Sequence, residues 1–153
     1  MIIKIDDVTS KEVLGLLEEH HKDMLLHSPP ESIHALDVTS LQGDDVTFWS
    51  AWIDEKLAGC GALKILTTSH AEIKSMRTSH NHRRKGVAAE LLQFILNYAV
   101  GKGYSQISLE TGSMDAFLPA RKMYEKYGFK YCQPFADYVE DAHSVFMTLN
   151  MPD

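Results

Sequence analysis

Hydrophobic and polar positions alternate in several short runs along the chain. Alternation predicts strands, because successive side chains on a strand point to opposite faces of a sheet. Seven runs have this character or are rich in β-branched and aromatic residues: 1–6, 46–53, 57–66, 71–79, 107–111, 131–135 and 144–151. Turn residues at 54–56 and 67–70 separate the second, third and fourth runs. These three runs are therefore predicted to form consecutive antiparallel strands.

Three longer segments instead repeat apolar residues at the spacing of three and four that is typical of an amphipathic helix. They lie at about residues 10–27, 87–99 and 116–127. Thr9, with Glu12 three positions later, predicts a capping box at the start of the first helix. Because these predicted helices lie between predicted strands, the chain is expected to have an α/β fold.

The remaining segment of real length, residues 28–37, has no periodicity. Pro29 and Pro30 stop the first helix and favour an extended start to this segment. Long irregular segments in compact domains are often functional, although a plain connector is equally compatible with the composition. With 153 residues, 44% of them hydrophobic, the chain is predicted to form one domain around one core.

Charge and hydropathy exclude some classes of protein. The formal net charge of −6 argues against a nucleic-acid-binding module, which usually presents a net basic face. No run approaches the roughly 18 apolar residues of a membrane span, and residues 1–6 lack the apolar region of a signal peptide. We therefore expect a cytoplasmic protein that binds neither nucleic acid nor membrane.

Cysteines and histidines give weaker signals. Cys60 and Cys132 could form a bridge, but free thiols are the better interpretation for a reduced compartment. The pairs His20-His21 and His80-x-His82 have no cysteine or carboxylate at ligand spacing. We expect no metal site, and most histidines at the surface.

The most specific chemical signal is a basic turn at residues 83–88, which joins the predicted strand 71–79 to the predicted helix 87–99. A glycine at such a turn lets the backbone approach a ligand, and the start of a helix adds unpaired N–H groups and a positive dipole end. This arrangement predicts a phosphate site, with a pyrophosphate as the expected ligand. The spacing of glycines matches neither a P-loop nor a dinucleotide fingerprint.

At Arg83, Gly86 and Ala88 the turn resembles [Gln/Arg]-x-x-Gly-x-[Gly/Ala], the coenzyme A pyrophosphate motif of the GNAT family of N-acetyltransferases. A second family signature, Ala-x-x-x-Tyr-x-x-x-Gly-Phe, matches at Ala120, Tyr124 and residues 128–129.

The order of the predicted elements is also that of the GNAT family, so the resemblance covers nearly the whole chain. Within the family the chain is most similar to the bacterial YsnE-type N-acetyltransferases, through residues 28–32, 72–77 and 144–147. The resemblance implies the GNAT fold: a mixed, mostly antiparallel sheet of about six to seven strands flanked by helices, with a strand-to-helix pyrophosphate loop. It also implies that acetyl-CoA is the co-substrate.

Carried over to this chain, the family geometry assigns cofactor contacts. The backbone of Met76 and Thr78 would pair with the pantetheine amides, and the amides of residues 84–89 would hold the pyrophosphate. Many relatives have an asparagine where this chain has Phe117, so Ser113 or a backbone group would have to supply that contact. The cofactor-side candidates are Met76, Thr78, Arg83, Arg84, Lys85, Gly86, Val87, Ala88, Ala89 and Ser113.

Moving an acetyl group from a thioester to an amine requires a neutral amine and a proton for the departing thiolate. An ammonium with a pKa near 10 is mostly unreactive at pH 7, so a general base is useful. Glu72 is the first candidate, because it lies 11 residues before Arg83, as the glutamate base of some GNAT enzymes does. Glu110 is the second candidate, as base or as amine-binding carboxylate. Either glutamate could instead be a solvated or ion-paired strand residue.

The resemblance makes Tyr124 the candidate acid beside the coenzyme sulfur, although Tyr124 could simply pack in the core. Neither cysteine occupies a position that argues for a nucleophile, which favours direct attack by the amine in a ternary complex. The acceptor, a small-molecule or peptide amine, would approach near the first helix and residues 28–37. The substrate-side candidates are Ser28, Glu31 and His34.

Two other classes of protein remain open at this point. A non-catalytic acyl-CoA-binding sensor would keep the phosphate turn but show no turnover. A phosphate-binding module unrelated to coenzyme A would show no preference for it over other nucleotides. Many relatives dimerise, so a homodimer is expected by analogy alone.

Overall fold

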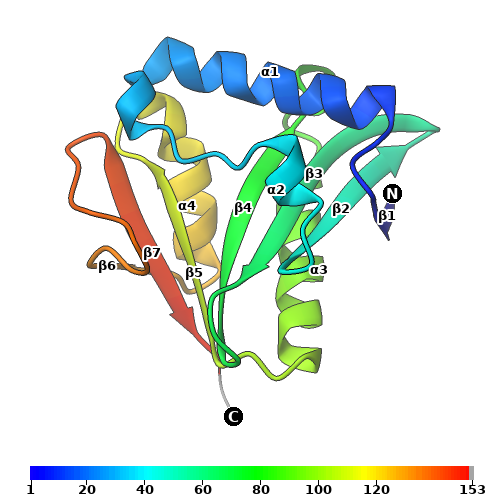
Figure 1. Cartoon of the computed structure of the whole chain (residues 1–153). Coiled ribbons are helices and arrows are strands. Elements are labelled where there is room, and N and C mark those ends of the chain that lie inside the picture. The colour runs from blue at the N-terminus through cyan, green and yellow to red at the C-terminus, as the bar shows by residue number, and fades with distance from the viewer. Residues whose placement is uncertain (152–153) are drawn as a thin grey trace.

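The computed structural model describes residues 1–151 and contains one seven-stranded sheet in the order β1-β2-β3-β4-β5-β7-β6 (Figure 1). The parallel pair is β4 with β5, and the other neighbouring strands are antiparallel. The strands are β1 Ile2–Ile5, β2 Val46–Ile53, β3 Lys56–Ile65, β4 His70–Thr78, β5 Gln106–Gly112, β6 Lys130–Cys132 and β7 Ser144–Asn150. The mixed, mostly antiparallel sheet expected from the sequence is confirmed.

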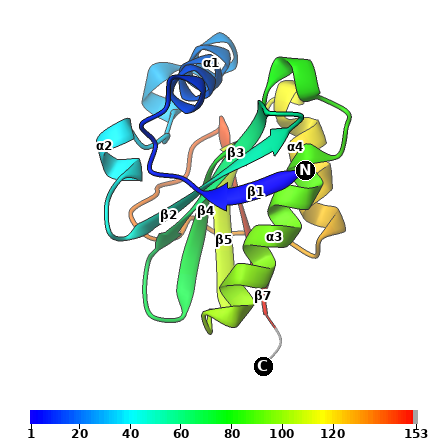
Figure 2. The same ribbon diagram turned by 90° about the vertical axis from the view of Figure 1, so that its right-hand side faces the viewer.

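Helices cover both faces of this sheet. Figure 2 shows α1 and α2 on one side and α3 and α4 on the other. The helices are α1 Lys11–His27, α2 Val38–Leu41, α3 Val87–Gly101 and α4 Leu118–Lys126. Short 3-10 turns lie at Pro30–Ser32, His80–His82 and Asp115–Phe117.

The predicted elements are present, with differences at their ends. The capping box at Thr9 is wrong by one residue, because Ser10 is extended and its Oγ accepts a hydrogen bond of 3.2 Å from the amide of Val13. The Thr9 hydroxyl instead donates to Asp7. The short helix α2 was not predicted; Asp37 caps it by accepting a hydrogen bond from the amide of Ser40.

The core has two parts, one on each face of the sheet. The larger lies under α3, whose apolar face, including Leu91, Leu92 and Ile95, is fully buried against the central strands. The smaller lies under α1 and is centred on Val13 and Phe48. Two packed faces fix the central strands in place, so their ends provide a rigid frame for a site.

The strands β4 and β5 separate along their length. They pair at only three positions, from His70↔Gln106 to Glu72↔Ser108, and then diverge beneath α1 (Figure 1). Beyond the last pair, β4 contains a bulge: the register with β3 shifts between Cys60 and Ala62, and Ser75 has φ +55°. The divergence leaves one edge of β4 free inside the protein.

Candidate active site

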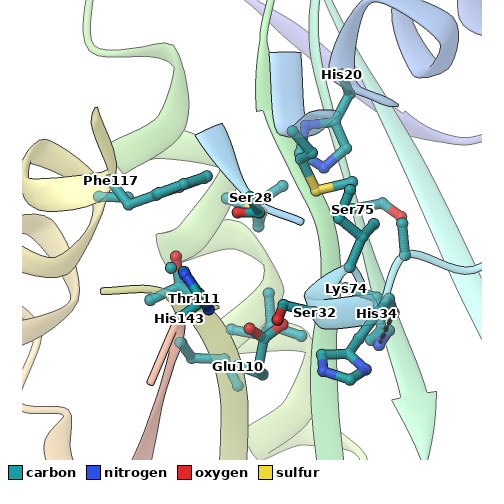
Figure 3. Close-up of a pocket in the computed structure, with 18 of the residues that line it drawn as sticks. His20, Ser28, Ser32, His34, Lys74, Ser75, Glu110, Thr111, Phe117 and His143 are labelled. Carbon is teal, nitrogen blue, oxygen red and sulfur yellow. Dashed lines mark hydrogen bonds between the residues drawn. The ribbon is translucent and has the colours of Figure 1, made fainter. Parts of the chain in front are cut away.

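A cavity of about 140 Å³ lies where β4 and β5 diverge (Figure 3). Its walls come from α1, from the segment that follows α1, from residues 73–76 of β4, from residues 109–112 of β5 and from α4. Segments that are far apart in the sequence therefore enclose one space beside the free edge of β4.

Glu110 and Tyr124 both line this cavity. Glu110 projects from β5, and burial raises the pKa of its carboxyl above the ordinary value. Tyr124 comes from α4 and is 5% exposed, with its ring packed edge-on against Phe129 at 5.6 Å between centroids. Burial also raises the pKa of Tyr124, so its hydroxyl keeps its proton. The cavity thus offers a carboxylate that can accept a proton and a phenol that can donate one.

Glu72 lies outside the lining of the cavity and is 3% exposed. Its Oε2 accepts hydrogen bonds from the Tyr138 hydroxyl at 2.5 Å and from Lys74 Nζ at 3.4 Å. The Tyr138 pKa is raised by burial and by the negative charge of Glu72. Oε2 of Glu72 therefore already has two donors, whereas Glu110 lines the cavity; the ranking of the two candidate bases stays a prediction.

The segment 133–143 packs against the segment that follows α1, and the sequence did not indicate this. Tyr138 packs edge-on against His34 at 5.0 Å between ring centroids. The Ser32 Oγ donates a hydrogen bond of 2.6 Å to Asp141 Oδ2, which joins the two loops. Among the substrate-side candidates, Ser28 and His34 line the cavity, and Glu31 is exposed outside it. Aromatic residues in an otherwise polar loop were the available signal for this segment.

The basic turn before α3 has the geometry of an anion site. Arg84 and Gly86 have positive φ angles of +64° and +78°, and Gly86 is the N-cap of α3 without a side-chain cap. The first helical hydrogen bond runs from the amide of Glu90 to the carbonyl of Gly86. The four amides of residues 86–89 therefore have no partner within the helix and can bind an anion. Residues 83–86 are exposed.

The other cofactor-side candidates differ in position. Met76 lines the cavity, and Thr78 ends β4 opposite Gly59. The Ser113 hydroxyl donates a hydrogen bond of 2.6 Å to the carbonyl of Ala142, so its proton is not available to a ligand. The Phe117 ring lines the cavity, so the position of the family's asparagine contributes apolar surface here.

Ion pairs hold α1 against β4 beside this site. The Arg77 guanidinium donates to Glu19 at 2.9 Å and also bonds Asp23, which pairs with Arg83 at 3.5 Å. Burial acts to raise the pKa of Asp23, but hydrogen bonds from His80 and Arg77 outweigh this and lower the pKa to about 2. These pairs fix the distance between the α1 wall of the cavity and the β4 bulge.

Both cysteines are free. The Cys60 thiol is buried and donates to the carbonyl of Ser75 at 3.2 Å, and burial raises its pKa to about 12. Of the histidines expected at the surface, His82 is buried, and His20, His34 and His70 are partly buried. Within residues 1–151, no three His, Cys, Asp or Glu side chains gather as a metal ion would require.

The match to known proteins agrees with this geometry. The model of the Acetyltransferase (GNAT) family matches residues 13–129. The uncharacterized N-acetyltransferase YsnE of Bacillus subtilis is 62% identical over 148 residues, which span 97% of this chain and 98% of YsnE. The uncharacterized N-acetyltransferase YedL of Escherichia coli is 49% identical, over 97% of this chain and 94% of YedL.

A GNAT family acetyltransferase from Elizabethkingia anophelis, solved with acetyl-CoA bound, has the same fold. It superposes with a TM-score of 0.72 at 17% identity, covering 98% of this chain and 97% of its own. The chain belongs to the GNAT family of acetyltransferases, and its similarity to YsnE confirms the resemblance found in the sequence. In the part of the chain that the structure describes, no helix is long and apolar enough to cross a membrane.

Proposed function

We propose that the protein transfers an acetyl group from acetyl-CoA to an amine by direct attack in a ternary complex, with Glu110 as the base and Tyr124 as the acid. The observation that carries this proposal is the single cavity at the β4–β5 divergence, which Glu110 and Tyr124 both line. The four amides at the start of α3 that have no partner within the helix supply the matching anion site.

The cofactor is expected to lie with its pyrophosphate on the amides of residues 86–89 and its pantetheine arm along the free edge of β4. Since β4 and β5 stop pairing after Glu72, the backbone of Met76 is available to an extended ligand, as an added strand would use it. Thr78 and the side chains of Arg84 and Lys85 would contact the arm and the phosphates. Because the Ser113 hydroxyl is already bonded to Ala142, backbone groups are the better source of the contact that Phe117 cannot make.

In the reaction, Glu110 would accept a proton from the bound ammonium, directly or through water. A carboxyl with a raised pKa is a stronger base than an ordinary glutamate, which suits this role. The neutral amine then attacks the thioester carbon, the carbon–sulfur bond breaks, and Tyr124 protonates the departing thiolate. The second proton, which the nitrogen loses as the amide forms, returns to the Tyr124 phenolate through water. Cys60 is unsuited to a covalent route, because its buried thiol remains protonated at neutral pH.

Glu72 has a different role in this proposal. Its bond to Tyr138 connects β4 to the segment 133–143, and its neighbour Lys74 on the same strand donates to the carbonyl of His34 at 2.8 Å. Glu72 therefore positions the two loops that border the acceptor end of the cavity. Ser28 and His34 would contact the acceptor there.

Two measurements test the proposal. Isothermal titration should show binding of CoA and acetyl-CoA but not of ATP, which separates this protein from a general phosphate-binding module. Thiol release from acetyl-CoA is then followed with a panel of amines: ethanolamine, propylamine, spermidine, kanamycin, L-lysine and a tripeptide. Binding of CoA without transfer to any amine of the panel would instead support the non-catalytic acyl-CoA sensor.

A further inference from the structure

His20 is a polar residue of the cavity wall to which the proposed chemistry gives no role. It projects from α1 toward Ser75 at the β4 bulge (Figure 3) and lines the same cavity as Glu110. Its Nδ1 is buried and, among residues 1–151, has no hydrogen-bond partner. A buried polar atom without a partner destabilises the folded chain, so its retention in the wall of a cavity calls for a function.

The ring of His20 is uncharged. Burial and the nearby Arg77 guanidinium lower the pKa of His20 to about 4, with a smaller contribution from His21, while Asp23 and Glu19 act in the opposite direction. A neutral imidazole carries one proton, so one nitrogen donates and the other accepts. Buried N–H groups without partners are rarer than buried acceptors without partners, which favours placing the proton on Nε2.

With Nδ1 buried, Nε2 is the polar atom that the ring offers to the cavity. An N–H donor pairs with an oxygen and not with an ammonium group. Glu110, in the same cavity, offers the opposite: a carboxylate that pairs with an ammonium. Because both side chains line one cavity, together they match a ligand that combines an amine with an oxygen.

We propose that His20 positions the acceptor by donating its Nε2–H to an oxygen beside the reacting amine, so that amines bearing a hydroxyl or carbonyl oxygen are preferred over simple alkylamines and polyamines. This inference rests on the acetyltransferase function proposed above. The cavity of about 140 Å³ also receives the thioester end of acetyl-CoA, so the acceptors that fit beside it are small; for comparison, an engineered cavity of about 150 Å³ holds benzene.

A pair of acceptors matched in size tests the proposal. Ethanolamine and propylamine differ by a hydroxyl in place of a methyl group, so the ratio of their kcat/KM values isolates the oxygen. The parent protein is expected to prefer ethanolamine by about tenfold, the value of one neutral hydrogen bond. His20→Leu should abolish the preference, and His20→Gln, whose amide nitrogen lies near the position of Nε2, should restore most of it. His21→Leu, at an exposed position on the same helix, should leave the ratio unchanged.

Two further readouts separate positioning from a structural role. The melting temperature of His20→Leu should be unchanged or higher, because a buried nitrogen without a partner is removed, and its Kd for CoA should equal that of the parent. Equal ratios in the parent and in His20→Leu would overturn the inference and leave the proposed function intact. A lower melting temperature with an unchanged ratio would make His20 structural. A weaker Kd for CoA would move His20 to the cofactor side and also overturn the inference. Should the parent bind CoA but acetylate no amine of the panel, the proposed function fails, and this inference fails with it.

Discussion

Replacing Gly86 with valine tests the anion site at the start of α3. Gly86 has φ +78°, and a Cβ added to it would meet no atom within 4 Å, so the substitution strains the backbone without a steric clash. A left-handed conformation costs an L-residue about 1–2 kcal/mol. For a chain of this length, that cost lowers the melting temperature by roughly 2–8 °C.

The effect on CoA binding should be larger than the effect on stability. Valine also favours a negative φ at residue 86, and a shift in that direction turns the neighbouring amides away from a common point. Loss of two hydrogen bonds to a charged phosphate, at about 1.5 kcal/mol each, weakens the affinity about 100-fold. Isothermal titration with CoA measures this change, and thermal melts followed by circular dichroism confirm that the variant folds.

Gly103 provides a matched control at the other end of the same helix. It has φ +86°, and a Cβ there would likewise meet nothing within 4 Å. Gly103→Val should therefore lose about the same stability as Gly86→Val and keep the CoA affinity of the parent. Equal CoA affinity in the two folded variants would refute the placement of the pyrophosphate on this turn.

Three other substitutions test the remaining assignments. Glu110→Gln should lower kcat/KM for the acceptor by about 10²–10⁴-fold. Because the pKa of Glu110 is raised, the acid limb of the parent's pH profile should lie above the 4.5 of an ordinary glutamate. A larger loss in Glu72→Gln would return the base role to Glu72. Tyr124→Phe should lower kcat with little change in the Kd for acetyl-CoA. High pH should not restore the rate, since the phenol supplies a proton to the thiolate. Recovery of the rate at high pH would contradict this role. Asp23→Asn should destabilise the fold at neutral pH, as measured by urea unfolding. The pKa of Asp23 falls from 3.8 to about 2 on folding, which corresponds to at most about 2.4 kcal/mol and, after solvent screening of a partly exposed pair, ~1 kcal/mol. Because the folded-state pKa is the lower one, this stabilisation is present above pH 3.8 and disappears as the pH falls toward 2; a difference between the two proteins that persists at pH 2 would exclude it.

Local features of the site were predictable from the sequence. The basic turn depends on a glycine and on the start of a helix, and both lie within the consecutive residues 83–89. The strands and helices followed from periodicity, because each buries one face against the same core. The errors at Thr9 and at α2 both concern helix starts, where Ser10 and Asp37 accept hydrogen bonds from the amides of Val13 and Ser40. Capping competes among adjacent polar residues, so composition alone could not decide it.

Long-range contacts decided the rest. The spacing to Arg83 ranked Glu72 before Glu110, but the fold places Glu110 in the cavity wall and gives the Glu72 carboxylate two donors, Lys74 and Tyr138, the latter 66 residues away. His20 belonged to a helix with an ordinary apolar stripe, and only the packing of α1 over the β4 bulge turned its ring into a wall of the cavity. The sequence by itself determined most of the strands and helices and the position of the glycine-containing turn at the start of α3, because those properties depend on neighbouring residues. The tertiary structure alone decided which carboxylate, which phenol and which imidazole share one space, because burial and hydrogen bonding depend on residues that the fold brings together from distant parts of the chain.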